Sequence, residues 1–472
     1  MSSRILTHAD IQDDFLYCSI LSALNCAPKQ LTADKVLEIE TFEVAHFDPS
    51  MDGYSLHNLQ GLECLSNLKN LTIAWCDAKD ISQIAKLTQL KKLSLALSCG
   101  PVDLNPLQYL VELQDLEIES CNVSNLAPLC GLIQLKSLSF CNGDFGNISC
   151  LKSLKNLKCL SVWAAQAELG TLLRDLPYLT ELYIDLNSTH IPIQNLRWIQ
   201  SMQNLQSLAL VSDFLPQLQF IPSLNSLQSL HIAADFIGNL EPLSNLKYLQ
   251  DLCIHSSEPL ENAGVLSTLP TLSVLNIQTP TFSLSNSKEL LNLKYLTIDC
   301  KQLENFMEIS HLKQLQSLWL YGNFGYLSPL TNLEHLTTLV LNFDNLIDLS
   351  PLKYLRQLKT FFITSNKLRN ISGISDIKSL EDLLIDGAVK DLSPLVNLSS
   401  LKRLELCNCK ISDFSFLNGL KQLQSLSLKH CKISSFNSLK ELPCLKNIRI
   451  GNSFIEDPCS LLNLQVNVNF YA

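Results

Sequence analysis

The sequence has no apolar stretch long enough to cross a membrane as a helix. Although 46% of its 472 residues are hydrophobic, Lys, Asn, Gln, Asp and Ser separate the leucines every few positions. A transmembrane helix needs about 20 consecutive apolar residues. The N-terminal sequence MSSRILTHADIQDDF carries acidic residues and lacks the apolar core of a signal peptide. We therefore expect a cytoplasmic protein without a membrane partner, and export as an effector by a route that needs no signal peptide stays open.

Positive charge is also scarce. The 35 Lys and Arg residues are outnumbered by 45 Asp and Glu residues, which gives a formal net charge of −10. Surfaces that bind nucleic acid need clustered Lys and Arg side chains. We therefore expect no nucleic-acid partner.

Catalytic and metal-binding motifs are missing as well. The sequence contains no GxxxxGK[ST], GxSxG, HExxH or CxxC motif. The nearest approach to a metal cluster is Cys407, Cys409, His430 and Cys431 in adjacent repeats. Cys409 and Cys431 are expected to point inward, and Cys407 and His430 outward, so one ion could not reach them all. We expect no enzyme, no cofactor, no metal site and no small-molecule substrate.

What the sequence does contain is one pattern of about 22 residues, repeated about 18 times in succession. The repeat beginning at Leu336, for example, reads LTTLVLNFDNLIDLSPLKYLRQ. The first leucines of the repeats are residues 68, 90, 113, 135, 157, 179, 205, 227, 249, 272, 293, 315, 336, 358, 380, 401, 423 and 445. A fixed period of this length indicates a solenoid, in which each unit contacts only its neighbours.

Each repeat has two halves with different spacing. Counted from the first leucine, positions 4 and 6 are apolar, an alternation typical of a strand with one buried face. Positions 11, 14, 17 and 20 are apolar too, a spacing of three that suits a 3₁₀ helix on the opposite wall. Leu-Ser-Pro-Leu recurs in this second half, at 327–330, 349–352 and 392–395. Serine there is expected to cap the turn, and proline to begin it.

The pattern LxxLxLxx(C/N)xIxDLSPLxxLxx resembles the class of leucine-rich repeats found in bacterial internalins and in SDS22-type phosphatase regulators. The resemblance covers about residues 62–468. It implies an α/β solenoid: a curved, right-handed superhelix with a parallel β-sheet on the concave face and 3₁₀ turns and loops on the convex face. Two repeats depart from the pattern, at 249–270 and at 179–204, and in the latter we expect an α-helix over residues 196–202.

The two ends of the solenoid are expected to differ from its repeats, because a terminal repeat would otherwise expose core leucines. Residues 1–61 are predicted to form an N-terminal cap, with a helix over 8–25 and a degenerate first strand at Leu37 and Ile39. Residues 62–472 are predicted to form the solenoid, ending in a strand that contains Leu464, Val466 and Val468.

The 17 cysteines do not follow a disulfide pattern. Cys76, Cys121, Cys409 and Cys431 each lie eight residues after the first leucine of their repeat, which indicates small buried residues stacked in a column. We expect free thiols and a reducing compartment.

The residues most informative about function are those that the strands turn away from the core, taken here as positions 3, 5, 7 and 8. Large apolar residues at such positions are not explained by the core. The candidate partner-binding residues are an acidic group, Asp115, Glu117, Glu119, Glu181, Tyr183 and Asp185, and a largely aromatic group, Asp251, His255, Tyr295, Asp299, Trp319, Tyr321, Phe343 and Phe362. Trp and Tyr are enriched in interface hot spots.

The sequence favours a non-enzymatic scaffold that binds a partner protein through its concave face. A bacterial effector, an inhibitor or immunity protein, and an SDS22-type phosphatase-regulating subunit all remain open. A self-associating structural protein is a further alternative. An enzyme with its chemistry in the N-terminal segment is disfavoured, because that segment contains no nucleophile and base in a recognisable arrangement.

Overall fold

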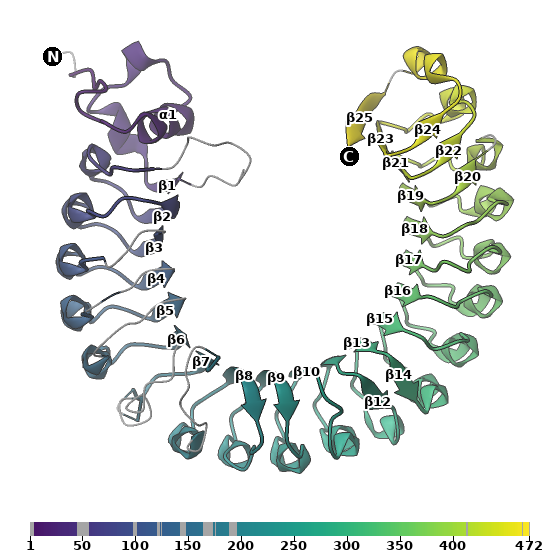
Figure 1. Cartoon of the computed structure of the whole chain (residues 1–472), viewed down its shortest axis with the longest axis horizontal. Helices are drawn as coiled ribbons and strands as arrows, with labels where there is room; N and C mark the ends of the chain where they lie inside the picture. The colour runs from purple at the N-terminus through teal and green to yellow at the C-terminus, as the bar shows by residue number, and fades with distance from the viewer. Residues whose placement is uncertain are drawn as a thin grey trace. The chain divides into compact units, whose positions relative to one another are not determined.

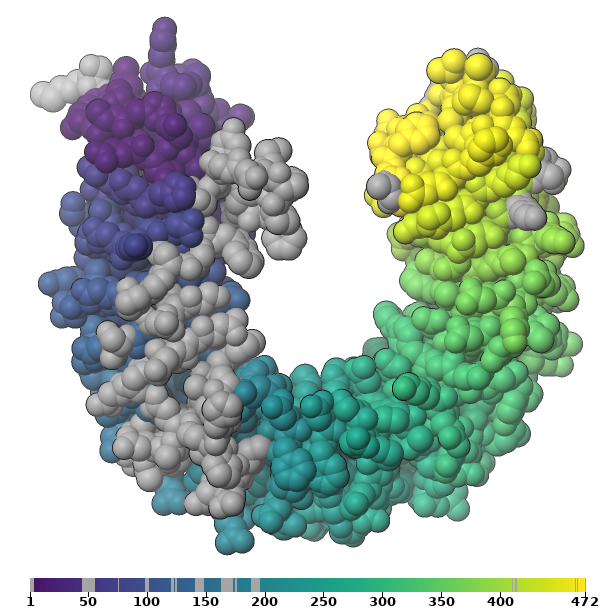
Figure 2. Space-filling view, in the orientation of Figure 1, coloured from purple at the N-terminus to yellow at the C-terminus, as the bar shows by residue number. Residues whose placement is uncertain are grey.

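The computed structural model describes residues 4–44, 56–97, 102–119, 123, 125–141, 148–163, 173–174, 176–187, 196–411, 414–464 and 466–471. Its contacts divide the chain into two compact units. The first comprises Met1–Asp213 and Gln219–Leu227, and the second comprises Phe214–Leu218 and Gln228–Ala472. Each unit is a stack of repeats that follow one another in chain order (Figure 2).

The dominant element is a parallel β-ladder to which each repeat adds one strand. The N-terminal strands are β1 (Thr41–Val44), β2 (Asn70–Cys76), β3 (Lys92–Leu97), β4 (Asp115–Glu119), β5 (Ser137–Cys141), β6 (Cys159–Trp163), β7 (Glu181–Asp185) and β8 (Ser207–Leu215). From β1 to β8, successive strands pair in parallel along the chain. This arrangement confirms the predicted parallel solenoid.

The second unit continues in the same manner. Its main strands are β9 (Ser229–Ile237), β10 (Asp251–Ser256), β11 (Val274–Gln278), β13 (Tyr295–Cys300), β15 (Ser317–Gly322), β16 (Thr338–Phe343), β17 (Thr360–Thr364), β18 (Asp382–Asp386), β19 (Arg403–Cys407), β21 (Ser425–Lys429), β23 (Asn447–Gly451) and β25 (Asn467–Tyr471). Two small parallel sheets lie beside them, β12 (Thr281–Ser283) with β14 (Gln302–Glu304), and β20 (Lys410–Ile411) with β22 (Lys432–Ile433) and β24 (Phe454–Ile455).

The second half of the repeats forms a short 3₁₀ helix, as the spacing of three predicts, except in the repeat beginning at Leu157, most of whose second half lies outside the described residues. In the N-terminal part these are η1 (Pro28–Gln30), η2 (Lys35–Glu38), η3 (Leu62–Cys64), η4 (Ser82–Lys86), η5 (Asn105–Tyr109), η6 (Ala127–Gly131), η7 (Ser149–Ser153), η8 (Leu196–Ser201) and η9 (Ile221–Ser223). The second unit adds η10 (Glu241–Asn245), η11 (Ala263–Thr268), η12 (Ser287–Glu289), η13 (Phe306–His311), η14 (Ser328–Asn332), η15 (Ser350–Tyr354), η16 (Ser372–Ile374), η17 (Ser393–Asn397), η18 (Ser415–Leu417), η19 (Asn437–Glu441) and η20 (Pro458–Asn463). Within each unit the strands line the inner side of the stack and the 3₁₀ helices its outer side (Figure 1).

The strands form where they do because alternate residues enter the core. In β3, Leu93, Leu95 and Leu97 are buried while the residues between them are not. The first leucine of the same repeat, Leu90, is fully buried as well. Because strands such as β16, β17 and β18 pair without a shift between equivalent positions, the same face of each strand meets the core in successive repeats; β2 and β3 depart from this between Ile73 and Cys76.

The turns into several 3₁₀ helices are capped by an aspartate or asparagine and not by the serine of Leu-Ser-Pro-Leu that the sequence suggested. Asp348 Oδ1 accepts a hydrogen bond from the backbone N–H of Ser350 (2.8 Å), and Asp391 Oδ1 accepts one from Ser393 (2.9 Å). Asn370 makes the equivalent bond to Ser372 (2.9 Å). These bonds lower the pKa of the Asp348 and Asp391 carboxyl groups. The Asp of the repeated phrase Asp-Leu-Ser-Pro-Leu is therefore the residue that fixes the turn.

Three predicted elements need correction, two near the N-terminal end and one in the long repeat. The N-terminal helix α1 runs only from Asp14 to Ala23, where Asp13 accepts hydrogen bonds from the N–H groups of Phe15 and Leu16. Leu37 and Ile39 are not a strand: Leu37 lies in η2, and the first strand is β1. The segment 196–202 is not an α-helix, because its apolar spacing of three gives the 3₁₀ helix η8.

The last strand begins later than predicted. Leu464 and Val466 precede β25, which contains Val468 and pairs with β23. No helix among the described residues is both long and apolar enough to span the membrane.

Cysteines of the predicted column are buried and bonded to the backbone. The Cys409 thiol donates to the carbonyl of Gly387 (3.4 Å) and the Cys431 thiol to that of Leu406 (3.3 Å). Cys76 donates to the carbonyl of Leu56 (3.1 Å), while Cys121 lies outside the described residues. A small thiol at this position thus ties the end of one strand to the preceding repeat.

Candidate functional site

The open face of a strand is defined here by repeat positions 3, 5 and 7, the residues between the buried leucines. Most of the candidate residues lie on it and are exposed or half-buried. In the first unit these are Asp115, Glu117, Glu119, Glu181 and Tyr183. In the second unit they are Asp251, His255, Tyr295, Asp299, Trp319, Tyr321 and Phe362. Their placement agrees with the expected alternation, and their role in binding stays a prediction.

Two candidates are not surface residues. Phe343 is only 1% exposed and packs edge-on against Phe324, with ring centroids 4.9 Å apart. It occupies position 8, and alternation along β16 turns that position inward after the exposed Asn342. Asp185 is 7% exposed, because its carboxylate turns back to accept the backbone N–H of Asn187 (2.9 Å). The prediction that Phe343 and Asp185 are exposed to a partner was therefore wrong.

The second unit carries a continuous apolar row along position 5. Trp319 pairs in register with Val340, Val340 with Phe362, and Phe362 with Leu384, across four consecutive strands. Trp319 is 39% exposed, Phe362 and Leu384 are half-buried, and Val340 is 9% exposed. At about 4.8 Å per strand the apolar row spans about 14 Å. Val340 and Leu384 were not expected, because they are not aromatic and the row becomes visible only when position 5 is followed from repeat to repeat.

Tyrosines and an acid border the apolar row on β13 and β15. Trp319 Nε1 donates to the Ser317 hydroxyl (3.1 Å), and the Trp319 and Tyr321 rings are 6.5 Å apart. Asp299 pairs in register with Tyr321. Burial, together with the negative charge of Asp299, raises the pKa of the Tyr321 hydroxyl, which therefore stays a neutral hydrogen-bond donor at physiological pH. Tyr295, 47% exposed, lies on the same strand as Asp299.

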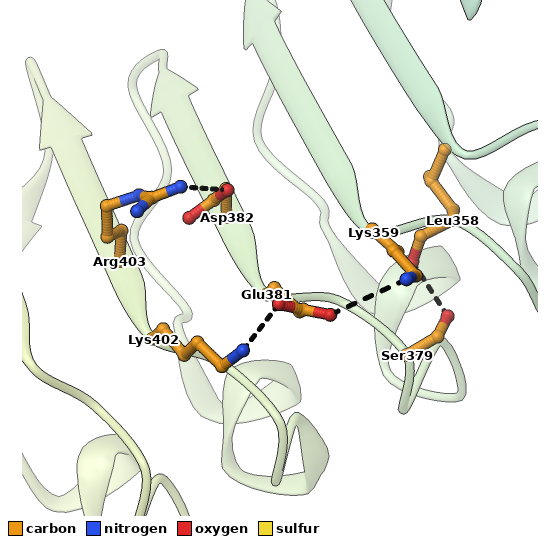
Figure 3. A network of polar contacts seen from close by, with 7 residues as sticks. All are labelled: Leu358, Lys359, Ser379, Glu381, Asp382, Lys402 and Arg403. Carbon is orange, nitrogen blue, oxygen red and sulfur yellow. Dashed lines mark hydrogen bonds and ion pairs between the residues drawn. The ribbon is translucent and has the colours of Figure 1, made fainter.

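Beyond the apolar row the strands carry paired charges (Figure 3). Glu381, between its register neighbours, lies 2.6 Å from the Lys402 ammonium and 3.9 Å from that of Lys359. The next residue along, Asp382, pairs with Arg403. Hydrogen bonding and charge attraction from Lys402 lower the pKa of the Glu381 carboxyl. Each charged side chain of this charge ladder thus has an oppositely charged partner in a neighbouring repeat.

In the first unit, the open-face residues of β4 are all acidic. Glu117 on β4 accepts a hydrogen bond from Ser94 Oγ (2.9 Å), and Glu119 is exposed two residues further along the strand. Glu181 on β7 pairs in register with Cys159 on β6. Burial and the hydrogen bond to Glu181 raise the pKa of Cys159 to about 11, so the thiol adds no charge. The face keeps a net negative charge over β4 and β7.

One cluster was not expected from the sequence at all. His231 on β9, Cys253 on β10 and His255, also on β10, bring one ligand atom each to within 4.8 Å of one another. Cys253 is the register partner of His231, and His255 lies on the same face two residues beyond it. The Cys253 Sγ atom is 3.4 Å from His255 Nε2, and the two imidazole rings are 5.4 Å apart.

Burial favours the neutral forms of Cys253 and His231. Burial raises the pKa of the Cys253 thiol, while burial and then the neighbouring His255 lower the pKa of His231. His231 Nε2 is shielded from solvent and has no hydrogen-bond partner in the described part of the chain. The sequence already contained a sign of this cluster, because His231 and Cys253 both occupy position 5 of consecutive repeats. Residues one repeat apart are easily overlooked as neighbours.

The cluster expected from the sequence not to bind a metal, Cys407, Cys409, His430 and Cys431, does not bring its side chains together. One reason is the expected one, and a second is new. Cys409 and Cys431 point into the core, where their thiols bond carbonyls. Cys407 occupies position 7 of the open face but is buried, with its thiol 3.6 Å from Glu405 Oε1, and burial raises its pKa to about 12. His430 is exposed at a positive φ of 50°. Among the described residues, the only group of three or more potential ligands that meets is His231, Cys253 and His255.

No protein-family model matches the chain, and no curated protein matches its sequence significantly. Solved structures do match. An internalin of Listeria monocytogenes, InlF, is 20% identical, with 93% of this chain and 96% of that one covered and a TM-score of 0.34. A leucine-rich-repeat protein of Leptospira interrogans is 18% identical, with 93% and 97% covered and a TM-score of 0.47.

A plant receptor ectodomain is also similar to this chain in structure. That of the Arabidopsis thaliana receptor kinase GASSHO1/SCHENGEN3, solved in complex with Casparian strip integrity factor 2, is 19% identical, with 84% of this chain and 51% of that one covered and a TM-score of 0.44. All these TM-scores lie below 0.5, so the description of the fold rests on the ladders of this chain. With a leucine-led repeat, parallel strands in register and 3₁₀ helices opposite them, the chain has the fold of a leucine-rich-repeat solenoid.

Proposed function

We propose that the chain is a non-enzymatic scaffold that binds a partner protein on the open face of its second unit. The observation that carries this proposal is the apolar row Trp319, Val340, Phe362 and Leu384, in register on neighbouring strands. The core does not require an indole at position 5, since Thr297 occupies the equivalent position one strand earlier. Large apolar side chains held on a rigid ladder lose little entropy when they meet a partner.

Exposure of an aromatic residue is not sufficient evidence by itself. Tyr109 and Tyr354, in the 3₁₀ helices η5 and η15 on the outer side, are more exposed than Trp319. Tyr354 stands beside Lys353, whose ammonium lies 5.0 Å from its ring centre. The open face differs because its apolar residues are contiguous. They lie in register on neighbouring strands and can contact one continuous surface of a partner. Interface hot spots cluster in this manner.

Self-association is the competing proposal, and it too has an observation in its favour. Phe470 on β25 and Phe454 on β24 are largely exposed at the C-terminal end of the second unit. Light scattering on the purified protein separates the proposals. A monomer supports a scaffold for another protein. A dimer that Phe470→Asp dissociates, while Trp319→Ala leaves it intact, supports self-association through the terminal strands.

The test of partner binding uses matched aromatic substitutions. The parent protein, the double variant Trp319→Ala/Phe362→Ala and the control Tyr354→Ala are immobilised separately, and a protein captured by the parent is then purified and its affinity for each measured. Removing one buried aromatic anchor typically costs about 2 kcal/mol, roughly 30-fold in affinity. We expect at least that loss for the double variant and almost none for Tyr354→Ala. Equal affinity of parent and double variant, with loss in Tyr354→Ala, would place the site on the outer side.

The biological setting of the partner is a narrower proposal. An effector, an inhibitor or immunity protein, and a phosphatase-regulating subunit would each use such a face, and the identity of the captured protein decides among them. A captured phosphatase catalytic subunit would favour the regulatory role.

A further inference from the structure

We propose that His231, Cys253 and His255 form a binding site for a Zn²⁺ ion, with the fourth coordination position open to water on the face of the sheet. The three residues belong to two adjacent strands of the second unit and share one face. The proposal is independent of the partner-binding function, because it concerns β9 and β10 and not the strands that carry the apolar row.

The geometry is the first support. A tetrahedral Zn²⁺ with Zn–S near 2.3 Å and Zn–N near 2.0–2.1 Å holds its ligand atoms roughly 3.3–3.6 Å apart. The Cys253 Sγ and His255 Nε2 atoms are already 3.4 Å apart. All three ligand atoms lie within 4.8 Å of one another. The remaining approach of about 1 to 1.5 Å is within reach of a rotation of the imidazole of His231.

The unused nitrogen of His231 is the second support. Its Nε2 is enclosed, yet no described residue donates to it or accepts from it. A buried polar atom without a partner costs about 1–3 kcal/mol, so such atoms in native structures call for an explanation. Its ring lies across from that of His255, and its register partner is the Cys253 backbone. An ion at the centre of the three residues would satisfy this atom.

The donor set decides the kind of ion. Mg²⁺ and Ca²⁺ take oxygen ligands, and this cluster presents two imidazole nitrogens and one sulfur. Zn²⁺ takes mixed nitrogen and sulfur sets, and three protein ligands with an open position are a common arrangement for it. All three residues are half-buried, so the fourth position faces solvent.

The test uses the full chain, stripped with a chelator and kept reduced with a phosphine. Co²⁺ replaces Zn²⁺ as the probe, because a cobalt ion bound by a thiolate in a tetrahedral site gives intense visible bands and a sulfur-to-metal charge-transfer band. We expect one equivalent of Co²⁺ to produce these bands and one equivalent of Zn²⁺ to abolish them. Zn²⁺ is also expected to raise the melting temperature, since it binds the folded state.

Substitutions at the cluster separate this site from the other cysteines of the chain. Cys253→Ser should remove the charge-transfer band, and His231→Ala and His255→Ala should each weaken Zn²⁺ binding at least about tenfold, which is the loss typical of removing even an outer-shell partner. The controls are Cys159→Ser, a half-buried thiol paired with Ser137 and Glu181, and His335→Ala, an exposed histidine. Neither control should change the bands or the affinity.

Two results would overturn the proposal. One is a charge-transfer band of unchanged intensity in Cys253→Ser, which would place the cobalt at another thiol. The other is the absence of one-equivalent binding at micromolar metal in the parent protein. Circular dichroism of every variant is recorded alongside. If Cys253→Ser does not fold, Zn²⁺ affinity in His231→Ala tests the site independently, because the imidazole can be removed without exposing a core leucine.

Discussion

The open faces of the two units are built on the same backbone and differ almost entirely in chemistry. In the first unit, the open faces of β4 and β7 carry the carboxylates Asp115, Glu117, Glu119 and Glu181. In the second unit, position 5 is apolar from β15 to β18, and the charges that follow are paired. The strands that carry these residues pair in parallel in both units. The difference shows that the fold requires apolar residues at positions 1, 4 and 6 of the repeat. The residues on the open face are free to vary and can serve recognition.

The sharpest form of this comparison sets two phenylalanines against each other. Phe343→Ala empties a site that is 1% exposed and removes the ring contact to Phe324, so we expect a loss of about 3–5 kcal/mol in unfolding free energy. Phe362→Ala, on the open face of the next strand, should cost about 1 kcal/mol. Urea denaturation followed by circular dichroism measures both, and hydrogen exchange in β16 shows whether the loss is local. Equal losses would mean that core and face are not distinguished as described.

The acidic face offers a second way to test the contrast, through rates of association. If the acidic group attracts a basic partner, Glu117→Gln/Glu119→Gln should slow association roughly threefold at low salt and leave dissociation nearly unchanged. The effect should fade as salt shortens the screening length. Stopped-flow or surface-based kinetics with the captured partner measure it. Glu112→Gln removes an exposed charge outside the open face, and an equal effect there would reduce the role of the group to net charge alone.

The smallest expected effect belongs to the charge ladder. Glu381→Gln breaks its contacts with Lys359 and Lys402, and we expect a slight fall in the denaturation midpoint that disappears at high salt. The pKa of Glu381 is lowered below its ordinary value of 4.5, mainly by the hydrogen bond from Lys402. Its contribution is therefore present at neutral pH and lost as the pH falls through the folded-state pKa. Glu334→Gln is the matched exposed control, and a difference between the variants that persists at pH 2 would contradict this account.

Much of the fold was predictable because the same sequence pattern occurs in every repeat of a solenoid. In the described repeats, the apolar spacing predicted the strand and the 3₁₀ helix, and the long repeat kept the spacing of three in η8. Where the repeat fades, prediction fails: Leu37 and Ile39 resemble a strand by alternation, yet the strand forms a few residues later, opposite β2. The capping role of Asp348 was missed because the serine beside proline is the better-known signal.

The candidate site was predictable only in part, since sequence gives the direction of a side chain and not its neighbours. Alternation placed Trp319 and Phe362 correctly, but counting position 8 as open misassigned Phe343. Asp185 is at an outward position and is buried nonetheless, because a local hydrogen bond turns it back. The meeting of His231 with His255 depends on the exact register of β9 on β10, which one chain read alone does not reveal.

The unbroken register makes the second unit a molecular ruler. Cys253, Asn276, Thr297 and Trp319 are successive register partners, so three strand spacings, about 14 Å, separate the histidine–cysteine cluster from the beginning of the apolar row. Deleting one whole repeat between them would shorten that interval by about 4.8 Å without altering any side chain on either side. Distances between binding groups on this protein can thus change in steps, by gain or loss of a repeat, and not by gradual adjustment of the backbone.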